Sequence, residues 1–455
     1  MSTLHSKAAK AFLADADKVT WHDATFWALR AKRDGMAAGL DEWEQLRETA
    51  SAIKKHTISH LDTYLERFSD NAKKNGVHVH WAKDAEEFNS TVLDILHSHG
   101  VKKMVKSKSM LTEECEMNPY LERNGIDVVE TDLGERILQL MHQKPSHIVM
   151  PAIHIKQEEV GKLFEKVLGS EKGNYDPTYL TYQARLSLRN EFLTAQAGMT
   201  GANFGVAETG EIVVCTNEGN ADMSTSVPKL HIAVMGIEKV IPNRRSLAVF
   251  QRLLCRSATG QPTTTFTSHF AKARPGGEMH IILVDNGRTD ILANPDHWQT
   301  LKCIRCGACM NTCPVYRRSG GYSYTYFIPG PIGINLGMGH DSMKYSDNLS
   351  ACSLCCSCDN VCSVKVNLSE QIYTWRQKLD SLGKANQEKK WMSKGMKIMF
   401  DNHALYDTAL KFAPLANHAP RLALYNGLNA WGKGHEMPVF AKESFHTLWK
   451  KGKVK

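Results

Sequence analysis

The distribution of cysteine restricts the fold of this chain more than any other sequence feature. Of twelve cysteines in 455 residues, nine lie between Cys303 and Cys362. The N-terminus carries acids and polar residues where a signal peptide needs an apolar stretch, so we expect a cytoplasmic protein. In that reducing compartment, clustered cysteines indicate metal binding rather than a disulfide framework. The remaining cysteines are interpreted as ordinary core or near-surface thiols: Cys115, Cys215 and Cys255.

The clustered cysteines form two runs, CIRCGACMNTCP and CSLCCSCDNVCS, with the same C-x2-C-x2-C-x3-C spacing. This is the spacing of bacterial two-cluster ferredoxins. Three closely spaced thiolates can surround one cubane, whereas the fourth is directed to the other cluster. The spacing therefore predicts two [4Fe-4S] clusters as cofactors. One would be held by Cys303, Cys306, Cys309 and Cys362, and the other by Cys313, Cys352, Cys355 and Cys358.

Zinc is the competing interpretation of the same cysteines. Structural zinc takes two C-x2-C pairs, or cysteine with histidine, and two identical four-cysteine runs fit that pattern poorly. Two departures from the ferredoxin pattern are present. Ser363 replaces the usual proline, and Cys356 stands where a glycine is common. We interpret Cys356 as a thiol that is not a ligand, with replacement of Cys352 as the alternative.

The segments around the cysteine runs indicate four regions. Residues 1–75 are predicted to be helical, and residues 76–298 alternate short apolar strands with helical stretches. The strands include VHVHWA, KKMVK, IDVVETD and HIVMPAI, followed by a two-strand unit turning at Thr209-Gly210, then LHIAVMG and MHIILVD. Such alternation predicts βαβ units and a mostly parallel sheet. We therefore expect an open-sheet α/β domain over 76–298.

The cysteine region, 299–375, is expected to be a helical ferredoxin module, because the linker between its runs is long. That linker contains GPIGINLGMG, which we interpret as loop and turn. Residues 376–455 are predicted to be helical, with breaks at Gly432, Gly434 and Pro438. No uninterrupted apolar stretch of about 18 residues occurs, so no membrane span is expected.

The positive charge of the chain is concentrated in its last region. Residues 376–455 contain 15 Lys/Arg and 6 Asp/Glu, a net charge of +9, which leaves −1 for residues 1–375. A solvated helical surface explains this, and an acidic partner subunit or the anionic inner face of a membrane explains it equally well. No nucleic-acid recognition motif is present, so no nucleic acid is expected as a partner.

Nearly the whole chain resembles the iron–sulfur subunit of the bacterial three-subunit L-lactate utilisation system (the LutB, or LldF, type). The resemblance is carried by VKSKSMLTEE, ETDLGERI and HIVMPAIH, which are similar to the first half of a LUD domain. It continues in GMTGANFGVAETGEIVVCTNEGNADM and SLAVFQRLLCRSATGQPTTTFTSHF, and residues of about 385–450 are similar to the C-terminal domain of that family.

The resemblance implies a front domain like those of NagB, RpiA and the CoA-transferases. It also implies a role in oxidising L-lactate to pyruvate, with a CCG-type cysteine-rich subunit and a LUD-only subunit as partners. A contact with the respiratory chain, or with the membrane surface through residues 376–455, fits that role. The alternative is an electron-transfer subunit for another 2-hydroxy acid such as glycolate, or for an unrelated dehydrogenase. We assign no catalytic residue to the chain.

A second site in the α/β domain is suggested by two segments. Lys106, Ser107, Lys108 and Ser109 follow a strand and open a helical stretch, a place where an anion can be received; the alternative is an exposed basic loop. Glu208, Asn217, Glu218 and Asn220 lie at strand ends, and a glutamate there could act as a nucleophile or be structural. His78 and His80 alternate on a strand and are interpreted as surface and core histidines.

Overall fold

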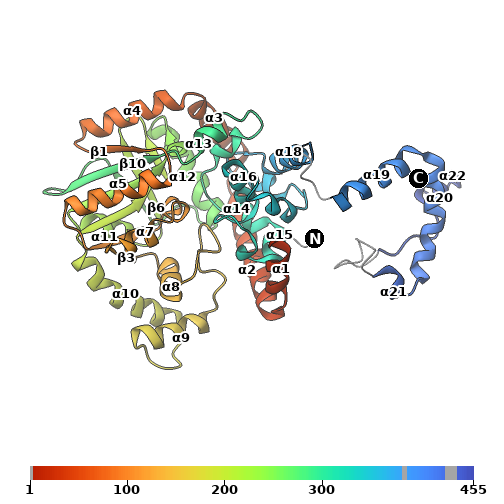
Figure 1. The fold of residues 1–455 in the computed structure, drawn as a ribbon, viewed down its shortest axis with the longest axis horizontal. Helices are drawn as coiled ribbons and strands as arrows, with labels where there is room; N and C mark the ends of the chain where they lie inside the picture. The colour runs from red at the N-terminus through yellow and green to blue at the C-terminus, as the bar shows by residue number, and fades with distance from the viewer. Residues whose placement is uncertain (1–3, 382–386, 426–437, 455) are drawn as a thin grey trace. The chain divides into compact units, whose positions relative to one another are not determined.

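The computed structural model describes residues 4–381, 387–425 and 438–454. The chain divides into two compact units, residues 1–375 and residues 376–455. The first unit contains an α/β domain preceded by helices and followed by the cysteine-rich module (Figure 1).

Four helices precede the first strand: α1 (Leu4–Leu13), α2 (Ala16–Ala38), α3 (Trp43–Ser59) and α4 (Leu61–Lys74). Asp15 caps α2 by accepting a hydrogen bond from the N–H of Lys18, the usual role of an N-cap carboxylate. Helix α4 packs its apolar side chains against the core sheet of the α/β domain, through Leu61, Leu65 and Phe68. Helices α2 and α3 instead reach the cysteine-rich module, which lies about 300 residues later in the sequence.

The core is a six-stranded parallel sheet in the order β1-β10-β7-β4-β2-β3. Its strands are β1 (His78–Ala82), β2 (Lys103–Ser107), β3 (Asp127–Glu130), β4 (Ala197–Gly201), β7 (Leu230–Gly236) and β10 (Glu278–Val284). Every pair is parallel, as the alternation of strands and helices predicts. The carboxyl ends of β2, β4, β7 and β10 therefore meet at one edge of the sheet.

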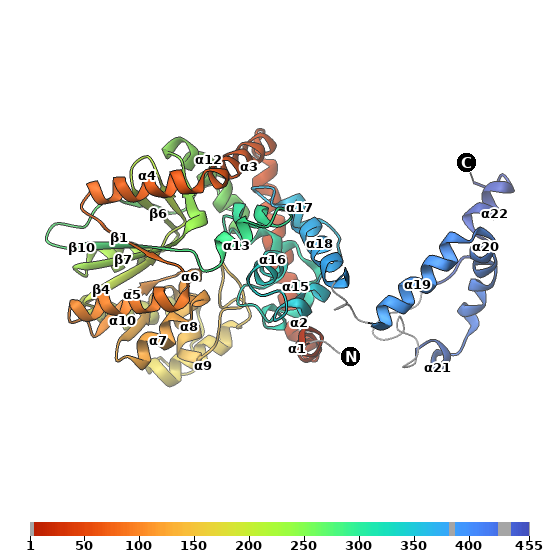
Figure 2. The ribbon, with the colours of Figure 1, turned by 45° about the horizontal axis from the view of Figure 1, so that its top comes forward.

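The two faces of this sheet are covered differently (Figure 2). One face is packed by α5 (Ala85–Ser98), α6 (Met110–Glu114) and α7 (Met117–Arg123), whose buried side chains include Phe88 and Leu121. The other is packed by α4 and by a second sheet with the order β8-β5-β6-β9. The strands of that sheet are β5 (Phe204–Val206), β6 (Glu211–Thr216), β8 (Val240–Ile241) and β9 (Phe266–Phe270). Both faces of the parallel sheet are thus buried, which explains its nearly continuous apolar strands.

The predicted turn at Thr209-Gly210 is present between the antiparallel strands β5 and β6. Gly210 has a φ of +70°, and a Cβ added to it would lie 2.2 Å from the backbone nitrogen of Ala72 in α4. Both the left-handed conformation and this close approach require glycine.

The predicted strand at HIVMPAI is wrong, because residues 147–153 form a series of turns. Pro151 has no N–H to give to a ladder. The N–H groups of Val149 and Met150 both donate to Nδ1 of His147, at 3.1 and 3.0 Å, so this segment satisfies its donors locally. The segment leads from α8 (Leu133–Met141) to α9 (Gln157–Leu168) and α10 (Pro177–Thr194).

The remaining elements of the α/β domain are α11 (Asn220–Ser226), η1 (Ile237–Lys239), α12 (Arg244–Ala258) and α13 (Arg288–Leu292). The cysteine-rich module is made of short helices: η2 (Trp298–Lys302), α14 (Ala308–Thr312), α15 (Pro314–Ser319), η3 (Gly321–Ser323), α16 (Gly330–His340), η4 (Ser346–Ala351), α17 (Ser357–Val361) and α18 (Leu368–Ser381). The expected helical module is therefore observed.

The interpretation of GPIGINLGMG as loop and turn is wrong, because these residues form the buried helix α16. Its glycines are explained by crowding. A Cβ added to Gly333 would lie 1.7 Å from the carbonyl oxygen of Ile328, and one added to Gly337 would lie 3.1 Å from the ring of Tyr326. Close packing outweighs the low helix propensity of glycine, which costs about 1 kcal/mol per residue relative to alanine.

The second unit is described over α19 (Gln387–Asp401), α20 (His403–Phe412), η5 (Ala413–His418), α21 (Arg421–Leu424) and α22 (Phe445–Lys450). It is helical, as expected, although the predicted breaks at Gly432 and Gly434 lie outside the described residues. Among the described parts of the chain, no helix combines the length and apolarity needed to cross a bilayer.

Candidate iron–sulfur centres and the adjoining cavity

Two small cavities in the cysteine-rich module are each bordered by four of the predicted ligands. Cys303, Cys306 and Cys309 of the first run line one cavity together with Cys362 of the second run. Cys352, Cys355 and Cys358 of the second run line the other together with Cys313. The structure therefore brings together the two sets that the spacing predicts, while the ligation itself stays a prediction. Apolar side chains complete the walls of the first cavity, among them Ile148, Ile304, Ile332, Val364 and Val366.

Left-handed backbone turns direct the first three thiols of each run into its cavity. In the first run Arg305 and Gly307 have φ values of +60° and +77°. In the second run Leu354 and Cys356 take the same positions, with φ values of +53° and +59°. The N–H of Arg305 donates to Sγ of Cys303 and that of Leu354 to Sγ of Cys352, both at 3.3 Å. The two runs therefore have matching local structures.

The fourth cysteine of each run lies at the end of a one-turn helix. Cys313 ends α14 and Cys362 ends α17, and these two helices pack against each other. This contact brings each fourth sulfur to the cavity of the opposite run. Sγ of Cys313 accepts a hydrogen bond from the backbone N–H of Tyr316 at 3.5 Å, and Sγ of Cys362 accepts one from the backbone N–H of Val366 at 3.4 Å.

The thiols suit a group that brings its own positive charge. Burial raises the pKa of Cys306 to about 12 and that of Cys313 to about 11. Burial also raises the pKa of Cys309 well above its usual range. Such thiols ionise when they coordinate a metal, because the metal's charge stabilises the thiolate. Four converging sulfurs in an apolar cavity therefore fit an iron–sulfur cube.

Cys356 occupies the position that Gly307 has in the first run. It borders the second cavity, but its side chain is exposed. Its Sγ donates to the carbonyl of Leu354 and accepts from the hydroxyl of Ser369, both at 3.4 Å. These contacts give the thiol partners within the protein.

A larger cavity of about 310 Å³ lies at the carboxyl edge of the parallel sheet, next to the cysteine-rich module. Three residues of the predicted anion site line it: Ser107 at the end of β2, and Lys108 and Ser109 directly after this strand. Asn217, Glu218 and Asn220, which follow β6, line its other side. Burial and the neighbouring Asp132 raise the pKa of Glu218, which favours its protonated form.

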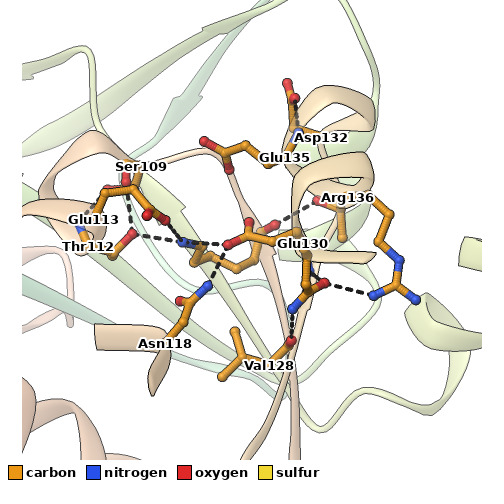
Figure 3. Close-up of polar contacts among 12 residues, drawn as sticks. Ser109, Thr112, Glu113, Asn118, Val128, Glu130, Asp132, Glu135 and Arg136 are labelled. Carbon is orange, nitrogen blue, oxygen red and sulfur yellow. Dashed lines mark hydrogen bonds and ion pairs between the residues drawn. The ribbon is translucent and has the colours of Figure 1, made fainter. Parts of the chain in front are cut away.

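Lys106 does not line this cavity. Its side chain is fully buried, and its amine lies 2.7 Å from a carboxylate oxygen of Glu130 and 3.2 Å from one of Glu113. The hydroxyl of Thr112 accepts a further hydrogen bond from it at 2.8 Å. Figure 3 labels Thr112, Glu113 and Glu130 among the polar contacts of this region. Burial opposes the charge of Lys106, but the two glutamates outweigh it and raise the pKa of the amine. The structure therefore gives Lys106 a place in a buried ion-pair cluster.

Glu208 also lies outside the cavity. It is exposed at the turn between β5 and β6, and its carboxylate accepts the N–H of Arg244 at 3.3 Å. The structure thus separates Glu208 from Asn217 and Glu218, with which the sequence grouped it.

Sequence reasoning did not assign to this site six further charged residues that line the same cavity, namely Glu114, Asp132, Glu238, Lys239, Arg288 and Arg305. Arg288 Nε donates to Glu238 Oε2 at 2.6 Å, and Arg305 Nη2 lies 3.4 Å from Glu238 Oε1. Burial opposes the charge of Glu238, but the two arginines hold its pKa down at about 2. Glu238 and Lys239 come one residue after the strand LHIAVMG, so their position near the carboxyl end of a parallel strand was a usable signal.

Comparison with known proteins matches two parts of the chain to described families. Residues 65–287 match the LUD domain, and residues 299–366 match the 4Fe-4S dicluster domain. Lactate utilization protein B of Geobacillus thermodenitrificans is 42% identical over 436 residues, which cover 92% of this chain and 90% of that protein. The protein of the same name from Shouchella clausii is 40% identical over 93% of this chain and 91% of its own length. The "Uncharacterized electron transport protein YkgF" of Escherichia coli is 38% identical over 92% and 91%.

The architecture and cofactor content follow from these matches together with the geometry. The chain consists of a LUD domain with a parallel α/β core, followed by a helical dicluster module that carries two [4Fe-4S] clusters. The boundaries expected for the four regions are not tested by these matches and stay predictions.

Proposed function

Because the chain belongs to the lactate utilization protein B family, we propose that it is the electron-transferring iron–sulfur subunit of an L-lactate-oxidising complex. The observation that supports the proposal most strongly is the pair of cysteine-lined cavities in one module. A [4Fe-4S] cluster accepts and releases one electron at a time, and two of them can serve a two-electron oxidation.

In this proposal the first cluster is held by Cys303, Cys306, Cys309 and Cys362, and the second by Cys313, Cys352, Cys355 and Cys358. The surrounding residues exclude water and adjust the potential. Ile304, Ile332 and Val364 supply apolar walls for the first site, and the N–H groups of Arg305 and Leu354 donate to cysteine sulfurs. Hydrogen bonds to the sulfurs and low exposure are the usual determinants of cluster potential.

The partners proposed from the family resemblance are a CCG-type cysteine-rich subunit and a LUD-only subunit. The basic region 376–455, with its net charge of +9, is proposed to contact an acidic partner or an anionic membrane face.

The crossed ligation can be tested with single cysteine variants. Protein purified without oxygen should contain about eight irons, as expected for two cubanes. Cys313→Ser should leave the same residual EPR spectrum as Cys352→Ser, and Cys362→Ser the same as Cys303→Ser. If the runs are not crossed, Cys313→Ser will instead resemble Cys303→Ser. Material that binds zinc in place of iron would refute the cluster assignment.

The physiological role can be tested in a deletion strain that has no other lactate-oxidising enzyme. The proposal requires loss of growth on L-lactate, restored by the wild-type gene and not by the Cys352→Ser variant. Normal growth on L-lactate with a defect on glycolate would instead favour the alternative, an electron-transfer subunit for another 2-hydroxy acid.

A further inference from the structure

The larger cavity of the LUD domain shares a wall with the site proposed for the first cluster. Ile148 lines both this cavity and the cavity bordered by Cys303, Cys306, Cys309 and Cys362. Arg305, which stands between Cys303 and Cys306 in the sequence, also lines the larger cavity. At Ile148 a single side chain therefore separates the two spaces.

The cations of the cavity differ in how they are neutralised. Arg288 is paired with Glu114 at 2.9 Å and Glu238 at 2.6 Å, and Lys108 donates to the carbonyl of Val149. Lys239 follows β7 in η1, and among the described residues no hydrogen bond or ion pair reaches its amine. Burial opposes the charge of this ammonium group, Glu238 and Cys303 attract it without direct contact, and an anion in the cavity would stabilise it further.

The remaining polar groups of the cavity suit a small oxygen-rich molecule. Asn203 uses its carbonyl oxygen to accept the N–H of Cys215 at 2.9 Å, which leaves its amide N–H₂ as a donor. Glu218 and Asp132 add carboxyl groups that can pair with a hydroxyl. The volume of about 310 Å³ lies at the lower end of the range for small-molecule sites.

We propose that this cavity binds a small organic carboxylate of the 2-hydroxy or 2-oxo acid class, with Lys239 as the counter-ion of its carboxylate. The substrate class rests on the proposed function, whereas the existence of an anion site rests on the cavity. Because Ile148 lines both spaces, the charge of a bound anion should lower the potential of the first cluster, whereas the second cavity shares no lining residue with the larger one.

The binding can be measured on the full-length protein carrying its clusters, by equilibrium dialysis against pyruvate and L-lactate, with the uncharged pyruvamide for comparison. Wild-type protein should bind one equivalent of an acid and no pyruvamide. Lys239→Met should weaken binding about tenfold to a hundredfold, the usual effect of losing one charged hydrogen bond. Lys272→Met, which removes an exposed lysine of the same domain, should bind as wild type.

A redox titration followed by EPR gives a second readout, in which the acid should shift one cluster signal and not the other. Lys239→Arg keeps the charge and should retain binding within a few-fold, which separates a binding role from a purely structural one. No binding by the wild type, or equal binding by Lys239→Met, would overturn the inference. Failure of the proposed function would be seen separately, as normal growth of the deletion strain on L-lactate.

A second, independent site is indicated by histidines that gather around Glu278 at the start of β10. Nε2 of His99 lies 3.2 Å from Glu278 Oε2, and Nε2 of His280 lies 2.9 Å from Glu278 Oε1. His78 on β1 places its Nε2 3.3 Å from the same Oε1. His80 meets Nδ1 of His280 at 2.9 Å. These residues come from β1, β10 and the end of α5, so the fold gathers them from three segments.

The two ring nitrogens of His99 have different surroundings. Its Nδ1 lies 2.8 Å from the carbonyl oxygen of Ile95, which only accepts, so Nδ1 carries a proton. Nε2 then faces the carboxylate of Glu278, which also only accepts when ionised. Nε2 of His99 therefore lies, with a ring nitrogen of His280 and a carboxylate oxygen of Glu278, in a group of three possible ligand atoms that are all within 4.8 Å of one another.

We infer that His99, His280 and Glu278 form a Zn²⁺ site, with His78 or water as the fourth ligand. Zinc–nitrogen and zinc–oxygen bonds of about 2.0–2.1 Å place tetrahedral ligands roughly 3.3 Å apart, and the three ligand atoms here lie within 4.8 Å of one another. His80 fits the supporting role, because a zinc-bound imidazole is oriented by a partner on its other nitrogen. His78 is exposed and His80 is half-buried, and their interpretation as surface and core histidines stays the alternative to this proposal.

Zinc binding can be tested on cluster-loaded protein that has been treated with EDTA and then titrated with Zn²⁺. Wild type and His97→Ala, an exposed histidine of the same helix, should bind one equivalent, whereas His99→Ala and Glu278→Gln should bind at least tenfold more weakly. X-ray absorption at the zinc edge should show nitrogen and oxygen ligands only. Sulfur ligands at about 2.3 Å, no bound zinc, or unchanged binding by His99→Ala would overturn the inference.

Discussion

Arg305 joins the first cysteine run to the LUD domain through Glu238. Its Nη2 lies 3.4 Å from Oε1 of Glu238, while its backbone N–H donates to Sγ of Cys303 at 3.3 Å. Glu238 is almost fully buried and also accepts Arg288 at 2.6 Å. The charge beside the proposed first cluster is therefore balanced by a carboxylate from the edge of the parallel sheet.

Replacing this carboxylate should change the potential of one cluster. In Glu238→Gln, Arg305 loses the one carboxylate partner that the described residues give it, so its positive charge favours the reduced, more negative cluster. We expect the reduction potential of the first cluster to rise by tens of millivolts, on the scale of a Coulomb interaction at an effective dielectric of about 20. An EPR-monitored redox titration measures this shift.

The control for that variant is Glu191→Gln, whose carboxylate pairs with Lys103 in the LUD domain and lines none of the three cavities. It should leave both potentials unchanged. An equal shift of both clusters in Glu238→Gln would contradict the assignment of Arg305 to the first cluster alone.

The sequence predicts some of these features because their signals are local. Cysteine spacing indicates two four-sulfur sets, and the alternation of apolar strands with helices indicates a parallel sheet. The contacts of the N-terminal helices have no local signal. Arg33 donates to the carbonyl of Val361 at 3.1 Å and Arg47 to that of Cys362 at 2.9 Å, across more than 300 residues. Sequence periodicity shows that a helix has a buried face but does not identify what covers it.

Lys106 and Lys108 illustrate a second limit. The two lysines are two residues apart, so strand alternation places both on the same face of the sheet. Because β2 ends at Ser107, Lys108 lies beyond the strand, and alternation does not reveal that only Lys108 meets the cavity. The helix α16 shows a third limit, because its glycines are explained by neighbours such as Ile328 and Tyr326 rather than by turn chemistry.

Cys356 should be replaceable by glycine without loss of iron. Its φ of +59° is strained for a residue with a Cβ, and the matching residue of the first run is Gly307. Cys356→Gly should therefore keep about eight irons and have stability equal to the wild type or up to about 1 kcal/mol higher. Iron analysis and thermal unfolding measure the two quantities.

Cys352→Ser is the comparison variant, and it should lose the second cluster. A fall of about half the iron in Cys356→Gly, with Cys352→Ser unaffected, would show that Cys356 is the ligand instead.

Removing the amine of Lys106 should destabilise the LUD domain. Lys106→Met leaves Glu130 and Glu113 without the cation that neutralises them, and Glu130 has a side-chain exposure of only 4%. Breaking a buried ion pair on one side costs about 3–5 kcal/mol. Denaturant unfolding of the wild type and of Lys106→Met measures the difference in their free energies of unfolding.

Lys103→Met is the matched control on the same strand, because Lys103 pairs with Glu191 at a partly exposed position. Lys103→Met should lower the free energy of unfolding by at most about 1 kcal/mol. If Lys106→Met costs no more than Lys103→Met, the buried cluster contributes little to stability.

Glu211 should make stability fall in acid. Its side chain is 1% exposed and accepts Arg244 at 2.6 and 2.8 Å and His269 at 3.2 Å. Burial opposes its ionisation, but the hydrogen bonds from Arg244 and His269 outweigh burial and lower its pKa. A carboxyl group whose pKa is lowered by folding stabilises the fold above its unfolded pKa of about 4.3, and that contribution is lost as pH falls through the lowered value. The difference in melting temperature between wild type and Glu211→Gln should therefore be constant from about pH 8 to 5 and should narrow below about pH 4.3. A difference that stays constant or widens in acid would show that the ion pair with Arg244 does not hold Glu211 ionised.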